Sequence, residues 1–255
     1  SDVTARYEWN VSKLNASALV GISQEYNKRE DERFRKYDLA DDALTSINGG
    51  STNGEIEGNY TEWAMRSYFG RINLSWDDKY LLEVNLRADG SSRFAPDKRW
   101  GWFPSVSAGW SISEEPFLKK AAGWLDMLKL RASIGNPGNQ NFDAYIAMKI
   151  YTYNNHHTNP WGVSAIINNF GNPDLEWQKT LDRNIGLDLV VFNNRLRVNF
   201  DYFSKKTDPL LVYTGVPSST GGTSVPANVG GQVTKGYTVV LNYALLKKEH
   251  LLWQV

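Results

Sequence analysis

The residues best suited to chemistry in this 255-residue chain gather in one aromatic and amide-rich segment, residues 151–161 (YTYNNHHTNPW). Amide groups hydrogen-bond to hydroxyls, and flat aromatic rings stack on sugar faces, so this segment could contact a glycan. The candidate ligand contacts are Tyr153, Asn154, His156 and Trp161. Ordinary packing of a surface loop is the competing interpretation.

Metal binding and covalent catalysis have little support in the residue types. The chain has three histidines and no cysteine, which excludes disulfides and thiolate metal sites. His156 and His157 are adjacent, and neighbours along an extended chain point to opposite sides. The sequence lacks a Gly-x-x-x-x-Gly-Lys phosphate loop, a His-Glu-x-x-His zinc motif and a Gly-x-Ser-x-Gly elbow. We expect no metal, no cofactor and no enzyme activity, although an Asp-His pair formed across strands would still allow a hydrolase.

Two aromatic-bounded segments indicate the elements that must position these residues. In residues 68–76, Tyr68, Ile72, Leu74 and Trp76 fall on one parity, and residues 102–110 repeat this spacing. Eight strand steps of ~3.4 Å, tilted by ~40°, span about 20 Å. This nearly matches the apolar band of ~25 Å between the aromatic girdles of a membrane barrel. We therefore predict an all-β fold of antiparallel transmembrane β-barrel strands.

The other parity of the alternating segments is polar. Period-2 alternation occurs at about 11–24, 63–76, 80–94, 100–113, 128–136, 176–192, 195–207, 232–246 and 251–255. Because charged residues recur on the polar parity of one strand after another, we predict one continuous hydrated interior. The residues that we expect to face this lumen are Asn73, Glu83, Asn85, Arg87, Arg131 and Arg197.

The connections between these segments alternate in length. Tight turns are predicted at 77–79, 193–195 and 247–250, and long excursions at 25–62, 88–99, 137–175 and 208–231. Short periplasmic turns and long extracellular loops are typical of outer-membrane barrels. Trp76, Tyr80 and Phe192 flank the short turns and would mark the periplasmic girdle.

Three connections have a distinctive composition. Residues 28–42 hold eleven charges of both signs, and we interpret them as a solvated loop, with partner docking as the alternative. Residues 48–59 are rich in turn formers and are expected to be mobile. Residues 113–125 are predicted to be helical, with Ser113 as the N-cap and Trp124 at the interface.

Overall composition permits a membrane barrel. Lysine plus arginine and aspartate plus glutamate number 28 each, so nothing indicates a nucleic-acid partner. The mean hydropathy is −0.47, and no apolar run approaches the ~18 residues of a spanning helix.

Several motifs resemble one family. Residues 85–94 (NLRADGSSRF) and 99–118 (RWGWFPSVSAGWSISEEPFL) resemble a signature of the SusC/RagA-type TonB-dependent transporters of Bacteroidetes. Further stretches resemble the same family in the family's order: 128–140, 172–178, 192–208, 217–221 and 228–236. The similarity covers most of residues 60–245, whereas residues 1–60 resemble the family only in their general character.

The resemblance implies a transporter of the Gram-negative outer membrane with a 22-stranded barrel and an N-terminal plug. A SusD-like surface lipoprotein would act as a lid, and TonB would pass energy for the import of oligosaccharides or peptides. Residues 1–255 would be a partial barrel domain that contacts outer-membrane lipid, with the plug domain, TonB-contacting segment and terminal strands absent. Two alternatives remain: a small stand-alone outer-membrane barrel for adhesion or structure, and a soluble carbohydrate-binding or hydrolytic β domain.

Overall fold

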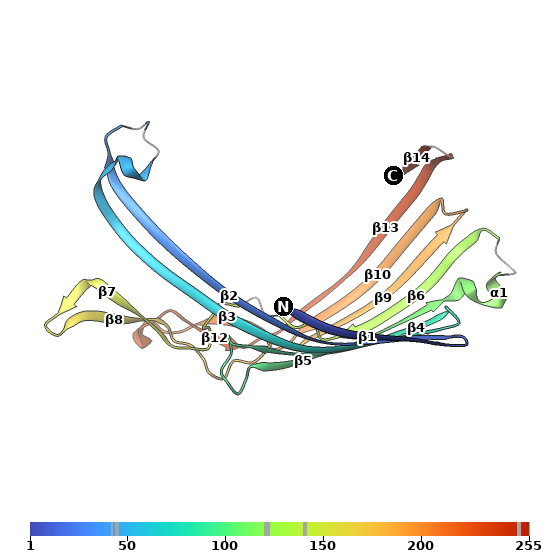
Figure 1. Cartoon of the computed structure of the whole chain (residues 1–255), viewed down its shortest axis with the longest axis horizontal. Helices are drawn as coiled ribbons and strands as arrows, with labels where there is room; N and C mark the ends of the chain where they lie inside the picture. Colours follow the sequence, from blue (N-terminus) through green and yellow to red (C-terminus); the bar gives the residue numbers. More distant parts are fainter. Residues whose placement is uncertain (42, 44–45, 120–122, 140–141, 249–250, 255) are drawn as a thin grey trace.

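A computed structural model of the chain describes residues 1–41, 43, 46–119, 123–139, 142–248 and 251–254. The side chains of residues 55, 154–159, 246–248 and 251–254 lie outside this description. The described residues form one curved antiparallel sheet of ten strands and two separate two-stranded hairpins (Figure 1).

The sheet runs in the order β1-β2-β3-β4-β5-β6-β9-β10-β13-β14. Its strands are β1 (Asp2–Val11), β2 (Leu14–Leu39), β3 (Gly50–Trp76), β4 (Tyr80–Ser91), β5 (Trp100–Ser111), β6 (Leu125–Gly135), β9 (Thr180–Val191), β10 (Leu196–Thr207), β13 (Gln232–Lys248) and β14 (Leu251–Gln254). The hairpins are β7 (Ile150–Asn159) with β8 (Gly162–Asn169), and β11 (Leu211–Gly215) with β12 (Ser224–Asn228).

The register of the sheet separates an apolar face from a polar face. On one face Ile72 lies opposite Val84, which lies opposite Val106. The neighbouring row on the other face joins Asn73, Glu83 and Ser107. Because side chains alternate across a strand, this pattern repeats along the sheet and confirms the predicted all-β, antiparallel fold.

The ends of the sheet differ in the length of their connections, as predicted. The turns after β3 and β9 lie at the same end as α1 (Pro116–Lys119), whereas both hairpins lie at the opposite end (Figure 1). Asp77 and Asp78 hold the first turn with φ angles of 53° and 54°, a left-handed conformation that Asp tolerates better than most residues. The predicted loop-length alternation is therefore confirmed.

The long excursion predicted at 25–62 is wrong. β2 continues to Leu39 and β3 begins at Gly50, so residues 28–39 of the charged segment and residues 50–59 of the turn-rich segment are strands. Beyond the neighbouring strands β1 and β4, these two strands form a two-stranded arm, residues 24–39 and 50–64. Neighbouring opposite charges pair along the arm, as in Arg29–Asp31 and Arg33–Glu57. Residues 28–39 are exposed and carry charges on both parities of β2, so the apolar alternation that identifies a strand disappears.

Three further predictions need correction. Residues 2–11 form a strand that was not predicted, and the excursions at 137–175 and 208–231 each contain a hairpin. The helix predicted at 113–125 reduces, within the described residues, to a 3-10 turn (Ile112–Glu114) and the four residues of α1. Ser113 is buried in that turn instead of capping the helix, and residues 120–122 lie outside the described part.

The connections at the hairpin end enclose a small apolar core. Its buried members are Phe94, Phe103, Ile146, Leu175, Trp177 and Leu211, and Phe142 packs against them. Trp177 is 6% exposed, lies 5.0 Å from the ring of Phe94, and donates its indole N–H to the carbonyl of Arg99 at 2.8 Å. The long connections are thus packed against the end of the sheet.

Aromatic side chains line the turn end of the sheet. The ring of Tyr80 stacks on that of Trp110 with 6.4 Å between the ring centroids, and the ring centroids of Trp124 and Phe192 lie 6.3 Å apart. The hydroxyl of Tyr80 donates to the carboxylate of Glu115 at 2.6 Å, and the indole N–H of Trp110 donates to the same oxygen at 3.2 Å. The backbone carbonyl of Glu115 accepts hydrogen bonds from the amides of Leu118 and Lys119 in α1. Glu115 therefore connects α1, through its carbonyl, to the aromatic side chains at the turn end of the sheet, through its carboxylate.

This attachment is expected to weaken in acid. The hydroxyl of Tyr80 and then the indole of Trp110 stabilise the carboxylate and hold the pKa of Glu115 below its usual value. A group with a lowered folded pKa stabilises the fold above its unfolded pKa, about 4.3, and loses that contribution as pH falls through the folded pKa. We expect hydrogen exchange of the Leu118 and Lys119 backbone amides, which donate to the carbonyl of Glu115, to accelerate as the pH falls through the folded pKa of Glu115, after correction for intrinsic rates.

The matched variant is Glu115→Gln, whose amide oxygen still accepts a hydrogen bond but does not titrate. Its exchange protection is expected to stay flat over the same acid range. A wild-type protein with equally flat protection would show that Glu115 does not hold α1.

Candidate functional site

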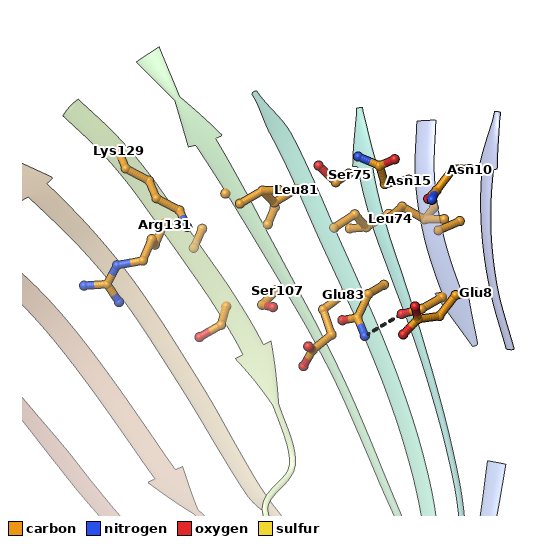
Figure 2. A pocket seen from close by; sticks show the side chains of 18 of the residues that line it. Glu8, Asn10, Asn15, Leu74, Ser75, Leu81, Glu83, Ser107, Lys129 and Arg131 are labelled. Atoms are coloured by element: carbon orange, nitrogen blue, oxygen red, sulfur yellow. Dashed lines mark hydrogen bonds between the residues drawn. The ribbon is translucent and has the colours of Figure 1, made fainter. Parts of the chain in front are cut away.

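The polar face of the sheet carries a cavity of about 630 Å³, lined by β1 to β6 and one residue of β9. Figure 2 shows Glu8 and Glu83 on one side of it, Lys129 and Arg131 on the other, and Ser107 between them. Small residues, mostly serine and glycine, occupy the polar face of β5, so β5 leaves open space in the middle of the cavity, and the charged side chains lie on either side of it. A cavity with this lining offers water and polar solutes many hydrogen-bonding partners.

A second cavity, of about 820 Å³, lies on the same face towards the loop core. The Arg71 Nε donates to the amide oxygen of Asn85 at 2.7 Å, and the Asn85 amide donates to Glu83 at 2.7 Å. The Arg87 Nε donates to both oxygens of Asp89, at 2.7 and 2.9 Å. These chains of hydrogen bonds hold the charged side chains in defined orientations.

A charge network joins three strands across the polar face. Arg131 on β6 forms a bidentate salt bridge with Asp188 on β9, in which two guanidinium nitrogens donate to the two carboxylate oxygens at 2.8 and 2.9 Å. It also reaches Asp201 on β10 at 3.1 Å, across Gly186. A Cβ atom at Gly186 would lie 2.6 Å from the Asp201 carboxylate and 2.7 Å from the Arg131 guanidinium. The absence of a side chain at Gly186 thus leaves room for the arginine to lie across β9, and a Cβ there would displace the ends of the Arg131 and Asp201 side chains.

The register places all six predicted lumen-facing residues on this polar face. Asn73, Glu83 and Arg131 line the first cavity, and Glu83, Asn85 and Arg87 line the second. Arg197 lies on the same face but is exposed and lines neither cavity.

The four candidate ligand contacts lie elsewhere, in the β7–β8 hairpin. Tyr153 is 74% exposed on β7, and Trp161 is 93% exposed at the turn between the strands. The side chains of Asn154 and His156 lie outside the described residues. Of the two candidates whose side chains the structure describes, Tyr153 and Trp161, neither lines a cavity of the polar face.

Sequence reasoning missed two sets of residues at the site. Asp188 and Asp201 belong to the network of Arg131, and their position on the polar parity of neighbouring strands was the available signal. Phe103 and Trp177 border the second cavity. Trp177 falls in the alternating segment predicted at 176–192, but β9 begins only at Thr180, so Trp177 lies in an irregular connection and its alternation did not indicate a site.

Two negative findings concern the part of the chain that the structure describes. No helix there has the length and apolar character needed to cross a membrane. No group of three or more histidine, aspartate or glutamate side chains there is arranged to hold a metal ion.

Comparison with known proteins gives consistent matches. The family model described as TonB dependent receptor-like, beta-barrel matches residues 1–255. TonB-dependent receptor SusC of Bacteroides thetaiotaomicron is 38% identical over 190 residues, which is 72% of this chain and 18% of that protein. TonB-dependent receptor P26 of Formosa agariphila is 32% identical over 256 residues, 98% of this chain and 26% of that protein. The chain therefore spans about a fifth to a quarter of the length of these relatives.

Solved structures show the same architecture. The RagAB peptide transporter matches with a TM-score of 0.83 at 29% identity, over 97% of this chain and 28% of that chain. The siderophore receptor PirA from Acinetobacter baumannii shares the fold, with a TM-score of 0.59 at 14% identity, over 96% of this chain and 34% of that chain. The chain belongs to the TonB-dependent receptor-like β-barrel family, and it is an outer-membrane protein of the SusC/RagA type.

Proposed function

We propose that this chain is part of the barrel wall of a nutrient importer that takes up oligosaccharides or peptides. In this proposal the protein transports its substrate without chemically changing it. The observation that carries the proposal is the continuous polar face, where two cavities of about 630 and 820 Å³ are bordered by hydrogen-bonded charged residues. Its family membership supports the same function.

The polar face would form the wall of a water-filled path. A solute that leaves bulk water must exchange its hydration for other hydrogen bonds. The alternating donors and acceptors of Arg71, Asn85 and Glu83 offer such bonds in sequence. Residues beyond this segment would supply the plug and the contact with TonB, and a SusD-like surface lipoprotein would cover the extracellular opening.

The direct test is uptake by cells that carry the full-length protein. We expect labelled oligosaccharides or peptides to accumulate only when both the transporter and TonB are present. Equal accumulation after deletion of TonB would contradict active import. Recovery of a folded, monodisperse protein without detergent would contradict the membrane barrel itself.

A pair of neighbouring substitutions tests the role of the polar face. Ser107 lines both cavities from the polar face, whereas Val106, which also borders the second cavity, belongs to the apolar row of the same strand, opposite Val84. Since a pore loses permeability when its lining becomes larger, Ser107→Trp is expected to slow uptake by about tenfold. Val106→Trp adds an indole on the lipid side and is expected to leave uptake close to wild type.

Both variants are first checked for equal amounts of folded barrel in the outer membrane. If Val106→Trp slows uptake as much as Ser107→Trp, the effect belongs to barrel assembly. If neither variant slows uptake, the substrate path does not follow this wall.

A further inference from the structure

The lipid-facing side of the sheet carries an apolar groove of about 820 Å³, which crosses β1 to β5. Apart from Thr4, the residues that line it are aliphatic, aromatic or glycine. Most of them belong to the apolar parity of their strands, opposite the two polar cavities. Because the chain is an outer-membrane protein, this groove opens towards the hydrocarbon of the bilayer.

Small residues form the floor of the groove. Ala5 and Gly70 lie in one row of the register, and Ala88 lies in the next. A Cβ atom at Gly70 would have only the carbonyl oxygen of Leu19 within 4 Å, at 3.7 Å. The described neighbours therefore do not require glycine at this position, and its missing side chain leaves the floor open.

Large side chains border this floor. Tyr68 stacks on Trp100 with 5.7 Å between the ring centroids. Ala88 lies between Tyr68 and Trp102 in the register and is only 7% exposed, although it faces lipid. A straight hydrocarbon chain in the groove would contact both the floor and the rings beside it. It would gain more dispersion contacts there than against a flat apolar face.

The first row beyond the groove is polar and carries a cation. Arg66 precedes Tyr68 on the same parity of β3, and the register places it between Gln24 and Gly90. In the described ranges its guanidinium forms no ion pair, and its one hydrogen bond is a long one, 3.5 Å to the amide oxygen of Gln24. The side chain is exposed, so its donors are available to an anion.

The position of Arg66 identifies the leaflet that faces this site. The row of Arg66 lies on the side of the groove towards the end of the sheet that carries both hairpins and the long connections (Figure 1). Long connections are extracellular in outer-membrane barrels. A lipid with its chain in the groove and its headgroup at Arg66 would therefore come from the outer leaflet, which consists of phosphorylated glycolipid.

We propose that this groove binds one molecule of lipopolysaccharide, with an acyl chain on the floor formed by Ala5, Gly70 and Ala88 and with Arg66 bound to a phosphate of the headgroup. The two contacts are complementary to the two halves of the lipid, since the groove is apolar and the row beyond it is cationic. The inference depends on the outer-membrane location of the chain and is independent of which solute the protein imports.

The test titrates the full-length protein in detergent with purified lipid A, and native mass spectrometry counts the bound lipid molecules. Gly70→Leu fills the floor of the groove, and we expect it to bind the first lipid A at least about tenfold more weakly, since displacing a few methylene groups suffices. The control Val84→Phe adds a similar apolar bulk to the same face outside the groove and is expected to bind like wild type.

A third variant tests the headgroup contact. We expect wild type to prefer lipid A to its dephosphorylated form by about fivefold, and Arg66→Gln to bind both forms equally. All three variants are first required to unfold at the wild-type temperature, so that a loss of binding cannot come from a damaged barrel.

Four outcomes would overturn the assignment. Wild type binding phosphatidylethanolamine as tightly as lipid A would show that the groove does not select the glycolipid. Gly70→Leu binding like wild type would place the lipid elsewhere. Val84→Phe losing as much affinity as Gly70→Leu would assign binding to the apolar face as a whole. A phosphate preference that persists in Arg66→Gln would remove Arg66 from the site.

Discussion

Trp177→Ala is expected to release the long connections from the end of the barrel. The ring centroid of Trp177 lies 5.0 Å from that of Phe94 and 5.1 Å from that of Phe103, and its indole N–H donates to the carbonyl of Arg99. Truncation of a buried tryptophan costs about 3–5 kcal/mol through lost contacts and the cavity left behind. Because the loop core is small, this loss should open it locally while the strands of the sheet stay paired.

The measurement is limited proteolysis of the full-length protein on intact cells, where only the extracellular side is accessible. We expect rapid cleavage within residues 137–175 and 208–231 of the variant. Trp161→Ala is the matched control, because its side chain is 93% exposed and its loss should change stability by no more than about 0.5 kcal/mol. Equal protease resistance of Trp177→Ala and wild type would mean that the core does not hold the connections.

Arg131→Met is expected to destabilise the barrel wall. The substitution leaves Asp188 and Asp201, with side-chain exposures of 13% and 27%, without their cation. Removing one partner of a fully buried ion pair costs ~3–5 kcal/mol. Since the Arg131 side chain is 36% exposed, water compensates part of the loss and we expect about 2 kcal/mol.

Urea unfolding of the full-length protein in lipid vesicles measures this loss of stability. Arg197→Met is the control, because Arg197 lies exposed on the same face and its loss is expected to cost no more than about 0.5 kcal/mol. Combining Arg131→Met with Asp188→Asn should cost less than the sum of the two single changes, since the residues contact each other. An unchanged urea midpoint for Arg131→Met would show that the network contributes nothing to stability.

The parity of side chains and the alternation of connection lengths could be read from the sequence. The rows Ile72–Val84–Val106 and Asn73–Glu83–Ser107 follow from a period of two residues, because one face meets lipid and the other meets water. The same reasoning failed for residues 25–62. There charged side chains occupy both parities of β2, so no apolar face imposes a period on the sequence.

The site itself shows where local patterns stop being informative. The sequence placed Arg131 on the polar face, but its partners Asp188 and Asp201 became visible only when the register brought three strands together. The space that Gly186 leaves is filled by side chains of the two neighbouring strands, which no local pattern encodes.

The sequence by itself determined the barrel wall, its two faces, its membrane location and its family, because these depend on short-range alternation and on continuous motifs. The tertiary structure alone decided three features: the buried core around Trp177, the charge network across β9, and the isolation of the β7–β8 hairpin. The first two arise from contacts between residues far apart along the chain, and the third arises because β7 and β8 pair only with each other. Such contacts depend on strand order and register, which side-chain periodicity does not specify.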